Sequence, residues 1–491
     1  MNGTHRVGWC AAALVVMLEA RASFAQSAER APSAVSAAPQ TQQRTERYRL
    51  RNGLEVVLEP HAEATHVAIH LRYHVGTRDQ PQGYTGLAHL CEHLMFEPPY
   101  AGARHYIALL EAMGATHVNG ETTPDATMYS ESVPAQHLQR ALWLESERMG
   151  YSFRRLNVQA LATQKRVVRN EGRERGGAAF LRFLRSIWHE LYPEWHPYFE
   201  RTEFADDLEA ITLDNVRWFH ERYYTPANAT LVVVGPFDTA ATRAWIEQYF
   251  GAIVGLPAPQ RSVSPPPSIT SARAVNLDAL VYSDRLSVRW ITDAYFRGDD
   301  AALDLIAFVL GDAAVGRLQR RLVRTLDYAE DVSVSQRSSA LSSEFSINVS
   351  CTEEHNANQA LGIVDEELER LRTTPVSEAE LAAAKRAFID ALRRAPSDPA
   401  ARAEQLALYS EQSQPDPDLS ERDIERYRAV TAAQIQSVAQ RAIANHRRLV
   451  ATLHRSSSAE HEIARASTIE SATRRAVTSD LGEHVSCGGR R

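Results

Sequence analysis

The stretch "HLCEHLMF", residues 89–96, contains two histidines four positions apart with a glutamate between them. On an α-helix, residues three and four apart share a face, so His89, Glu92 and His93 would project together from one turn. Two imidazoles at this spacing can bind one Zn²⁺, and an open catalytic zinc site usually takes a third protein ligand. The alternative is an ordinary pair of structural histidines, since H-x-x-E-H arises by chance in about one in twenty chains of this histidine content.

The sequence around this helix predicts an α+β fold. Residues 48–60 read as a β-hairpin with Asn52-Gly53 at its turn, and residues 66–76 alternate like a strand. Helical patterns cover 86–96, 104–114, 135–150 and 157–175, and residues 228–237 return to a buried strand.

The proline-rich stretch "GLPAPQRSVSPPPS", residues 255–268, predicts a linker between two domains. Beyond it the order recurs as a degenerate copy without the histidines: a strand at 286–292, helices through 299–326, strands at 331–338 and 344–351, further helices and a final strand at 448–454. We therefore expect two tandem homologous domains, residues 46–254 and 269–455, each with a mainly antiparallel sheet packed with helices.

Both ends of the chain are expected to lie outside these domains. Residues 1–25 resemble a secretory signal, with Arg6 before a short apolar run and small residues at Ser23 and Ala25. An uncleaved anchor is the alternative, but a run of about ten apolar residues is too short to span a bilayer. Residues 26–45 read as a flexible lead-in and 456–491 as a disordered tail. The expected product is an exported protein, periplasmic or secreted, without a membrane span.

Charge and cysteine content exclude other classes. Removing Arg6, Arg21 and Glu19 with the signal leaves 52 basic and 60 acidic residues, so the mature chain is acidic and offers no nucleic-acid surface. Three cysteines then remain, too few for a disulfide framework. Cys91 would point away from the histidine face, so it reads as a buried apolar residue, and Cys487 as an exposed thiol of the tail.

Several motifs together resemble a known family. In order along the chain stand "LRNGLEVVLEP", "VGTRDQPQGYTGLAHLCEHLMF", "TTPDATMYSESVP", "LWLESERMG", "QKRVVRNEGRER", "HPY" and "RYYTPANATLVVVGPFD". This pattern resembles the inverted-zincin peptidases related to pitrilysin, insulin-degrading enzyme and the mitochondrial processing peptidase, whose metal motif is H-x-x-E-H. The resemblance covers about residues 46–455 and is closest to the short two-domain bacterial branch with a processing-peptidase-like metallohydrolase fold.

The resemblance implies a complete zinc site with one Zn²⁺ per chain. The family's third ligand is a glutamate on another helix, and Glu171 stands at the matching position, 78 residues after His93. Glu174 is the competing carboxylate, with flanks that match less well. Many relatives carry a second glutamate seven residues before the ligand, where this chain has Gln164, an amide that can hydrogen-bond a ligand but adds no charge. Glu92 would be the general base of peptide hydrolysis.

The resemblance also implies how a peptide would be held. The segment "THVNGETT" lies where the family has an edge strand that pairs with an extended substrate, and Asn119 matches a substrate-binding asparagine. The alternative is a plain turn at Asn119-Gly120.

The second half departs from the family pattern. Active relatives have an arginine and, seven residues later, a tyrosine that stabilise the tetrahedral intermediate. Arg324 fits the arginine, but the position seven residues on is Asp331, and Tyr328 is one helical turn away. We therefore expect this chain to be the zinc-bearing subunit of a homodimer or, with a second related subunit carrying the arginine–tyrosine pair, of a heterodimer.

The resulting hypothesis is a zinc endopeptidase acting on peptides or unfolded segments. The alternatives are a non-catalytic peptide-binding or scaffolding subunit of a protease complex, and a zinc hydrolase with a non-peptide substrate. The intact H-x-x-E-H motif and Glu171 argue against the scaffold.

Overall fold

The structure, a computed structural model, describes residues 45–97, 105–174, 177–199, 204–261, 265–412 and 418–456. The expected signal, almost all of the lead-in and nearly the whole tail lie outside the described residues. Among the described helices, none is both long enough and apolar enough to cross a membrane.

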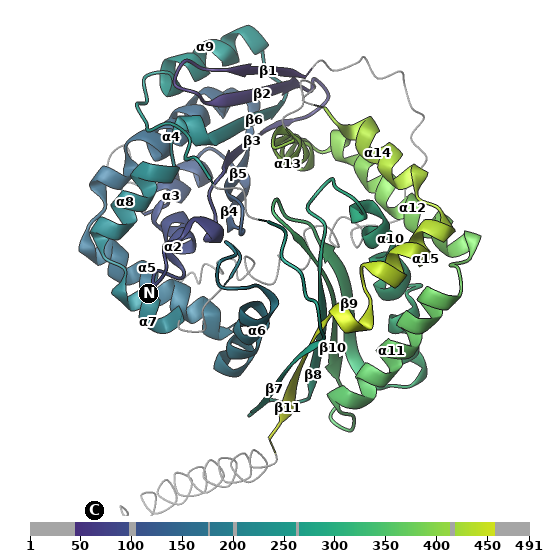
Figure 1. Ribbon diagram of the computed structural model, residues 1–491. Helices are drawn as coiled ribbons and strands as arrows, with labels where there is room; N and C mark the ends of the chain where they lie inside the picture. Colours follow the sequence, from purple (N-terminus) through teal and green to yellow (C-terminus); the bar gives the residue numbers. More distant parts are fainter. Residues whose placement is uncertain are drawn as a thin grey trace, which may run out of the picture.

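The first half of the chain builds one sheet and the helices that cover it (Figure 1). Its strands are β1 (Glu46–Arg49), β2 (Glu55–Pro60), β3 (His66–Tyr73), β4 (Thr116–Thr122), β5 (Thr127–Pro134) and β6 (Ala229–Gly235). Its helices are α2 (Leu87–Leu94), α3 (Tyr106–Glu111), α4 (Leu138–Gly150), α5 (Val158–Glu174), α6 (Gly177–Leu191), α7 (Phe204–Ala210), α8 (Leu213–Tyr223) and α9 (Thr239–Phe250).

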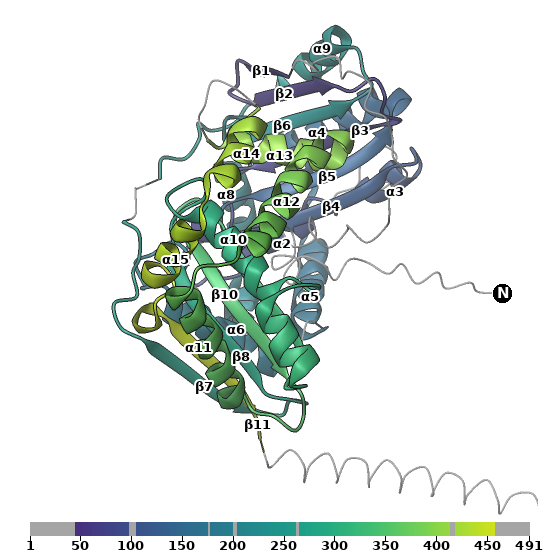
Figure 2. The same cartoon turned by 90° about the vertical axis from the view of Figure 1, so that its right-hand side faces the viewer.

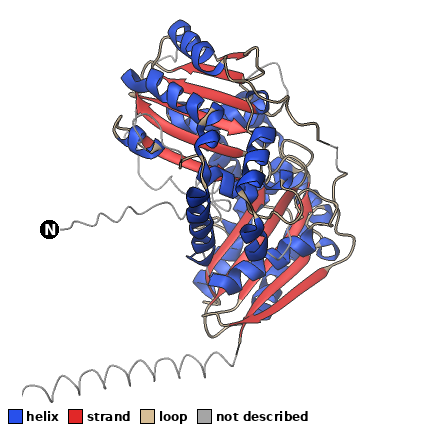
Figure 3. Ribbon diagram, turned by 90° about the vertical axis from the view of Figure 1, so that its left-hand side faces the viewer, coloured by secondary structure: helices blue, strands red, loops and turns tan. Residues whose placement is uncertain are grey.

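The second half builds another sheet with its own helices (Figure 3). Its strands are β7 (Arg273–Ala279), β8 (Arg285–Thr292), β9 (Ala329–Arg337), β10 (Ser343–Cys351) and β11 (Leu449–Arg455). Its helices are α10 (Asp300–Gly311), the π-helical turn η7 (Gln319–Thr325), α11 (Ala357–Thr373), α12 (Glu378–Arg394), α13 (Pro399–Ser410), α14 (Ser420–Ala429) and α15 (Ala432–Arg441). Strand β7 was not predicted, because four of its seven residues are exposed and polar side chains interrupt its apolar ones.

The two sheets share one topology. In the described residues the first sheet has the order β1-β2-β6-β3-β5-β4 and the second has β7-β11-β8-β10-β9. Without β1, the two strand orders match: β2, β3, β4, β5 and β6 occupy the same positions in the first sheet as β7, β8, β9, β10 and β11 in the second. Strand β2 runs parallel to β6, and its counterpart β7 runs parallel to β11; the other pairs are antiparallel. The predicted α+β class with two mainly antiparallel sheets is confirmed.

Each half lends one helix to the sheet of the other half. Helix α13 packs on β3 and β6, where Ala403, Leu406 and Ala407 bury Val57 and Val232 (Figure 2). Helix α6 packs on β7 and β11 through an apolar cluster that includes Phe183, Ile187, Leu449 and Leu453. This exchange ties the two halves together by buried apolar surface.

The connection between the halves has no regular structure in its described part. Residues 255–261 and 265–268 belong to no helix or strand. Arg261 nevertheless holds this segment on the first half, because its Nε lies 2.8 Å from Oδ1 of Asp79 and its Nη2 donates to the carbonyl of His74.

Candidate metal centre

Helix α2 is anchored at its first turn by a side-chain amide. Gly86 precedes the helix with a φ of 94°, a left-handed conformation that suits glycine. Oε1 of Gln80 accepts from the backbone N–H of Gly86 at 3.1 Å and of Ala88 at 2.9 Å, which satisfies donors that a helix start leaves unpaired. Leu87, Leu90, Cys91 and Leu94 are buried in the core, which leaves the face with His89, Glu92 and His93 toward the site.

The two histidines converge with a carboxylate from a second helix. The Nε2 atoms of His89 and His93 lie 3.2 Å apart. Helix α5 packs against α2 and places Oε2 of Glu171 3.7 Å from Nε2 of His89, and its Oε1 3.5 Å from Nε2 of His93. Residues separated by 78 positions in the sequence therefore meet at one point.

These distances fit a tetrahedral metal site. A tetrahedron with zinc–ligand bonds of about 2.0–2.1 Å has edges of about 3.3 Å. The separations of 3.2 Å between the two nitrogens and of 3.5 and 3.7 Å from them to the two oxygens of Glu171 are close to that edge. Two imidazole nitrogens and a carboxylate oxygen are also a common donor set for catalytic zinc. The described residues thus fit the group that the family resemblance implies, with His89, His93 and Glu171 as the residues that would hold it.

Glu92 lies beside this convergence point and contacts β4. One of its oxygens lies within 4.8 Å of ligand nitrogens of both histidines, so proximity alone would also allow it as a ligand. Its Oε2, however, accepts a 2.6 Å hydrogen bond from the hydroxyl of Thr122. The side chain is only 4% exposed, and burial raises the pKa of Glu92 to about 7, against the opposing effects of His93 and Thr122. This environment suits a group that exchanges protons near neutral pH.

Strand β4 forms the wall beside Glu92. A β-carbon at Gly120 would lie 2.9 Å from Oε1 of Glu92 and 3.0 Å from Cε2 of Phe96, so the glycine leaves space that the carboxylate fills. Asn119 is exposed on the same strand, opposite Ser130 of β5. β4 is the last strand in the order of its sheet. Because residues 116–122 form an edge strand, the alternative of a plain turn at Asn119-Gly120 is wrong.

The outer side of His93 is hydrogen-bonded. Its Nδ1 lies 3.1 Å from Oε1 of Gln164 on α5, and Nε2 of Gln164 donates to Oε1 of Glu97 at 2.5 Å. Gln164 is buried, with 8% exposure. Gln164 therefore lies beside His93, one of the proposed ligands.

Arg324 lies in a different environment. It is exposed in η7, where Nη1 donates to the carbonyl of Ala314 at 2.8 Å and Nη2 donates to the carbonyl of Ala313. Asp331 is exposed on β9, opposite Ser350 of β10. Tyr328 stacks on His355, with ring centroids 3.8 Å apart. Within the part of the chain that the structure describes, none of these contacts joins Arg324, Asp331 or Tyr328 to the histidine cluster.

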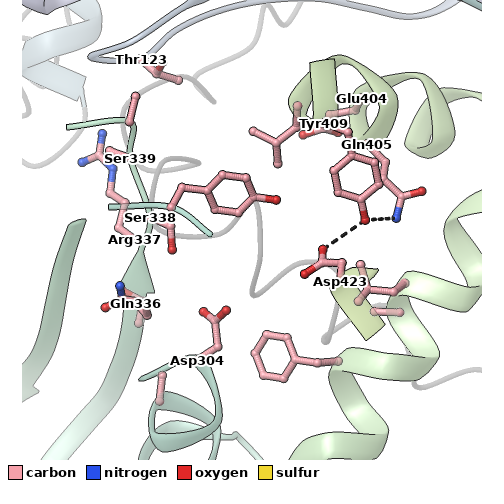
Figure 4. A pocket seen from close by; sticks show the side chains of 18 of the residues that line it. Thr123, Asp304, Gln336, Arg337, Ser338, Ser339, Glu404, Gln405, Tyr409 and Asp423 are labelled. Atoms are coloured by element: carbon pink, nitrogen blue, oxygen red, sulfur yellow. Dashed lines mark hydrogen bonds between the residues drawn. The ribbon is translucent and has the colours of Figure 1, made fainter. Parts of the chain in front are cut away.

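A cavity of about 500 Å³ lies between the two halves. Arg72 and Glu121 line it from the first sheet, Gln336 and Arg337 from β9, and further residues come from α10, α12 and α13 (Figure 4). On its far wall the hydroxyl of Tyr409 donates to Oδ2 of Asp423 and accepts from Nε2 of Gln405 (Figure 4). Strand β4 separates this cavity from the histidines, because Glu121 faces the cavity while Thr122 faces Glu92.

Sequence reasoning missed several residues of this site. Thr122, Gly120 and Glu97 contact Glu92 or Gln164 but belong to no motif that names them. The alternation of β4 could have placed Gly120 and Thr122 on one face, since neighbouring strand residues point to opposite sides. For Glu97 the sequence offers no comparable signal.

Two family models match this chain. The family model described as insulinase, peptidase family M16, matches residues 55–174, which include both histidines, Glu92 and Glu171. The model described as the peptidase M16 inactive domain matches residues 210–388. The chain belongs to peptidase family M16. The second match agrees with a second half that resembles the first but has no counterpart of its histidine motif.

Relatives within the M16 family include named zinc proteases. The zinc protease PqqE of Helicobacter pylori is 28% identical over 291 residues, which cover 56% of this chain and 62% of that protein. The probable zinc protease PqqL of Escherichia coli is 28% identical over 229 residues, 44% of this chain and 24% of that protein. The matches thus span less than two thirds of these relatives.

Solved M16 structures share the fold. The crystal structure of a protease from Helicobacter pylori matches with a TM-score of 0.77 at 23% identity, covering 84% of this chain and 99% of that one. The periplasmic protease PqqL from Escherichia coli matches with a TM-score of 0.67 at 21% identity, over 87% of this chain and 49% of that one. At these identities the likeness establishes the architecture of the two halves.

Proposed function

We propose that this M16 protein is a zinc-dependent endopeptidase that hydrolyses peptides or unfolded polypeptide segments. The observation that carries the proposal is the convergence of Nε2 of His89, Nε2 of His93 and the carboxylate of Glu171 at separations close to the edges of a tetrahedral site. The relatives named as zinc proteases support the same metal.

Each residue of the site has a separate task in this reaction. His89, His93 and Glu171 would hold Zn²⁺, which would supply Lewis-acid chemistry: activation of a water molecule and polarisation of the scissile carbonyl. Glu92 takes the proton of the attacking water and passes it to the departing amine. Thr122 holds the carboxylate of Glu92 in place through its 2.6 Å hydrogen bond.

The substrate would bind as an extended strand. β4 is an edge strand whose residue Thr122 contacts Glu92, so a peptide added to this edge passes the metal site. Asn119 is exposed on that strand and would bind the substrate main chain. The side chains of such a peptide alternate, which turns every second one toward the cavity lined by Glu121. Extended binding of this kind favours unfolded segments over folded proteins.

A second subunit would complete the site. Arg324 donates its hydrogen bonds to backbone carbonyls of its own half. By the family resemblance, Asp331 occupies the position where active relatives have a tyrosine. We infer that this chain acts as the zinc-bearing subunit of a dimer, with an arginine and a tyrosine supplied by a related subunit. The expected signal at residues 1–25 and the relative described as a periplasmic protease support action in the periplasm.

The proposal is tested by incubating the zinc-loaded chain with a mixed pool of quenched fluorescent peptides, beside Glu92→Gln. Glu111→Gln, which changes an exposed glutamate of α3, serves as the matched control. We expect cleavage by the wild type and by Glu111→Gln and none by Glu92→Gln, with one zinc bound in all three. Equal cleavage by Glu92→Gln would remove Glu92 from the mechanism.

The requirement for a partner is tested in the same assay. Weak cleavage that rises strongly when a related subunit with the arginine–tyrosine pair is added supports the heterodimer, and full activity of the chain alone rules that requirement out. Stoichiometric zinc with no cleavage under either condition would favour the non-catalytic peptide-binding subunit.

A further inference from the structure

Three groups form a continuous hydrogen-bonded series outward from the metal site. Nδ1 of His93 lies 3.1 Å from Oε1 of Gln164, and Nε2 of Gln164 lies 2.5 Å from Oε1 of Glu97. The middle residue is an amide, which has a donating end and an accepting end that can exchange places by rotation. The end of the amide that faces Nδ1 of His93 decides whether Nε2 of the same ring carries a proton or a free lone pair.

Glu97 determines that orientation. An ionised carboxylate only accepts hydrogen bonds, so the NH₂ end of Gln164 must face Glu97 and its oxygen must face His93. An amide oxygen in turn requires a proton on Nδ1 of His93. The neutral imidazole then carries its lone pair on Nε2, the atom that lies 3.2 Å from Nε2 of His89 and 3.5 Å from Glu171.

Without the carboxylate the same amide could act against metal binding. A rotated Gln164 would donate from its NH₂ end to Nδ1 of His93, which would stabilise the tautomer with a proton on Nε2. That proton occupies the position a metal needs. Because Gln164 is buried, with 8% exposure, water competes little for either end of the amide.

We propose that Glu97 is a positioning residue of the metal centre: by orienting the amide of Gln164, it sets the tautomer in which His93 can bind zinc. The inference rests on the zinc site of the proposed function but not on peptide hydrolysis. A carboxylate at position 164 would place a negative charge directly beside His93. In this chain the negative charge is on Glu97, which reaches His93 only through Gln164. Outer-shell partners of this kind change metal affinity by about 10- to 100-fold when removed.

The test measures zinc affinity on the full chain by competition with a fluorescent chelator at fixed pH. We expect Glu97→Gln to weaken zinc binding by about 10-fold or more, because glutamine can present its own NH₂ group to Gln164 and no longer enforces one orientation. The double variant Glu97→Gln with Gln164→Glu should recover affinity, since a carboxylate at 164 accepts directly from Nδ1 of His93. Glu111→Gln is the control for an exposed glutamate, and thermal unfolding of the apo forms checks that each variant folds.

A second measurement reads the tautomer without any metal. In the apo protein with ¹⁵N-labelled histidine, we expect the ring shifts of His93 to report the Nδ1–H form in the wild type and the double variant, and a mixture in Glu97→Gln. Unchanged zinc affinity and unchanged ring shifts in Glu97→Gln would overturn the inference. If affinity and tautomer follow the expected pattern while the wild type cleaves no peptide, the proposed hydrolysis fails and this inference stands.

Discussion

The hydroxyl of Thr122 donates a 2.6 Å hydrogen bond to Oε2 of Glu92, and both side chains are buried. The donor comes from the edge strand β4 and the acceptor from helix α2, so this contact fixes the proposed base relative to the strand that would hold the substrate. A buried carboxylate with one firm partner keeps its orientation better than a solvated one.

Thr122→Val removes that donor and keeps the shape of the side chain. A hydrogen bond to a charged group contributes about 1.5–3 kcal/mol, so we expect kcat to fall by about 10- to 100-fold. Zinc affinity should not change, because the side chain of Thr122 donates to Glu92, which is not one of the three proposed ligands. Thr116→Val, at the exposed start of the same strand, is the control. Steady-state kinetics and zinc titration on both variants check the prediction, and an unaltered kcat in Thr122→Val would contradict it.

Glu171→Gln tests the third ligand. The neutral amide cannot supply the anionic carboxylate whose Oε1 lies 3.5 Å from His93 and whose Oε2 lies 3.7 Å from His89. Zinc affinity should therefore fall by more than the roughly 10- to 100-fold typical of changes outside the ligand set. Glu174→Gln, three residues later on α5, should bind zinc normally. Equilibrium dialysis with metal analysis distinguishes the two glutamates, and loss of zinc from Glu174→Gln alone would reassign the ligand.

Arg148→Met tests how much a buried ion pair on helix α4 contributes to stability. The guanidinium of Arg148 is fully buried, pairs with Glu145, and lies 3.9 Å from the ring centroid of Tyr129. Glu131 is also buried and interacts with both Glu145 and Arg148. Removing the cation leaves these two carboxyl groups in the core without a compensating charge, which should lower the free energy of unfolding by about 3–5 kcal/mol. Arg140→Met on the exposed face of the same helix is the control, and urea unfolding gives the comparison. Equal stability of the two variants would show that the pair contributes nothing.

His220→Phe tests whether a buried histidine makes the folded protein less stable at acid pH. His220 stacks on Phe153 with ring centroids 3.8 Å apart, and burial lowers its pKa to about 3. The unfolded chain binds a proton on this histidine below about pH 6.5, whereas the folded chain does not until about pH 3, so its contribution to stability is present above pH 6.5 and lost as the pH falls through that window. At pH 5 the loss amounts to about 2 kcal/mol.

Phenylalanine keeps the stacking and cannot titrate. We therefore expect the unfolding free energy of His220→Phe to fall less steeply between about pH 6.5 and pH 4 than that of the wild type. The difference in slope should correspond to about one fewer proton taken up on unfolding. His70 is a similar buried histidine with a pKa lowered to about 3 by burial and Arg72, so part of the slope should remain. Parallel curves for the two proteins would show that His220 does not titrate as inferred.

The local features of the metal helix were predictable from the sequence. His89, Glu92 and His93 share one helical face because the periodicity of a helix is fixed, and the apolar residues between them mark the face that is buried. The hairpin at 48–60 and the strands at 66–73 and 229–235 follow from alternation and turn residues in the same way. Glu171 was predicted from family resemblance, since spacing along the chain does not reveal which helix packs on which.

What the sequence by itself determined is the repeated α+β pattern, the family and the residues on one face of helix α2. Tertiary structure decided which carboxylate lies beside the histidines, that Thr122 and Gly120 enclose Glu92, that Glu97 contacts Gln164, and that α6 and α13 pack on each other's sheets. The physical reason is that periodicity fixes the direction of a side chain relative to its own helix or strand. The partner it meets depends on how apolar faces far apart in the chain bury one another, and no local pattern encodes that choice.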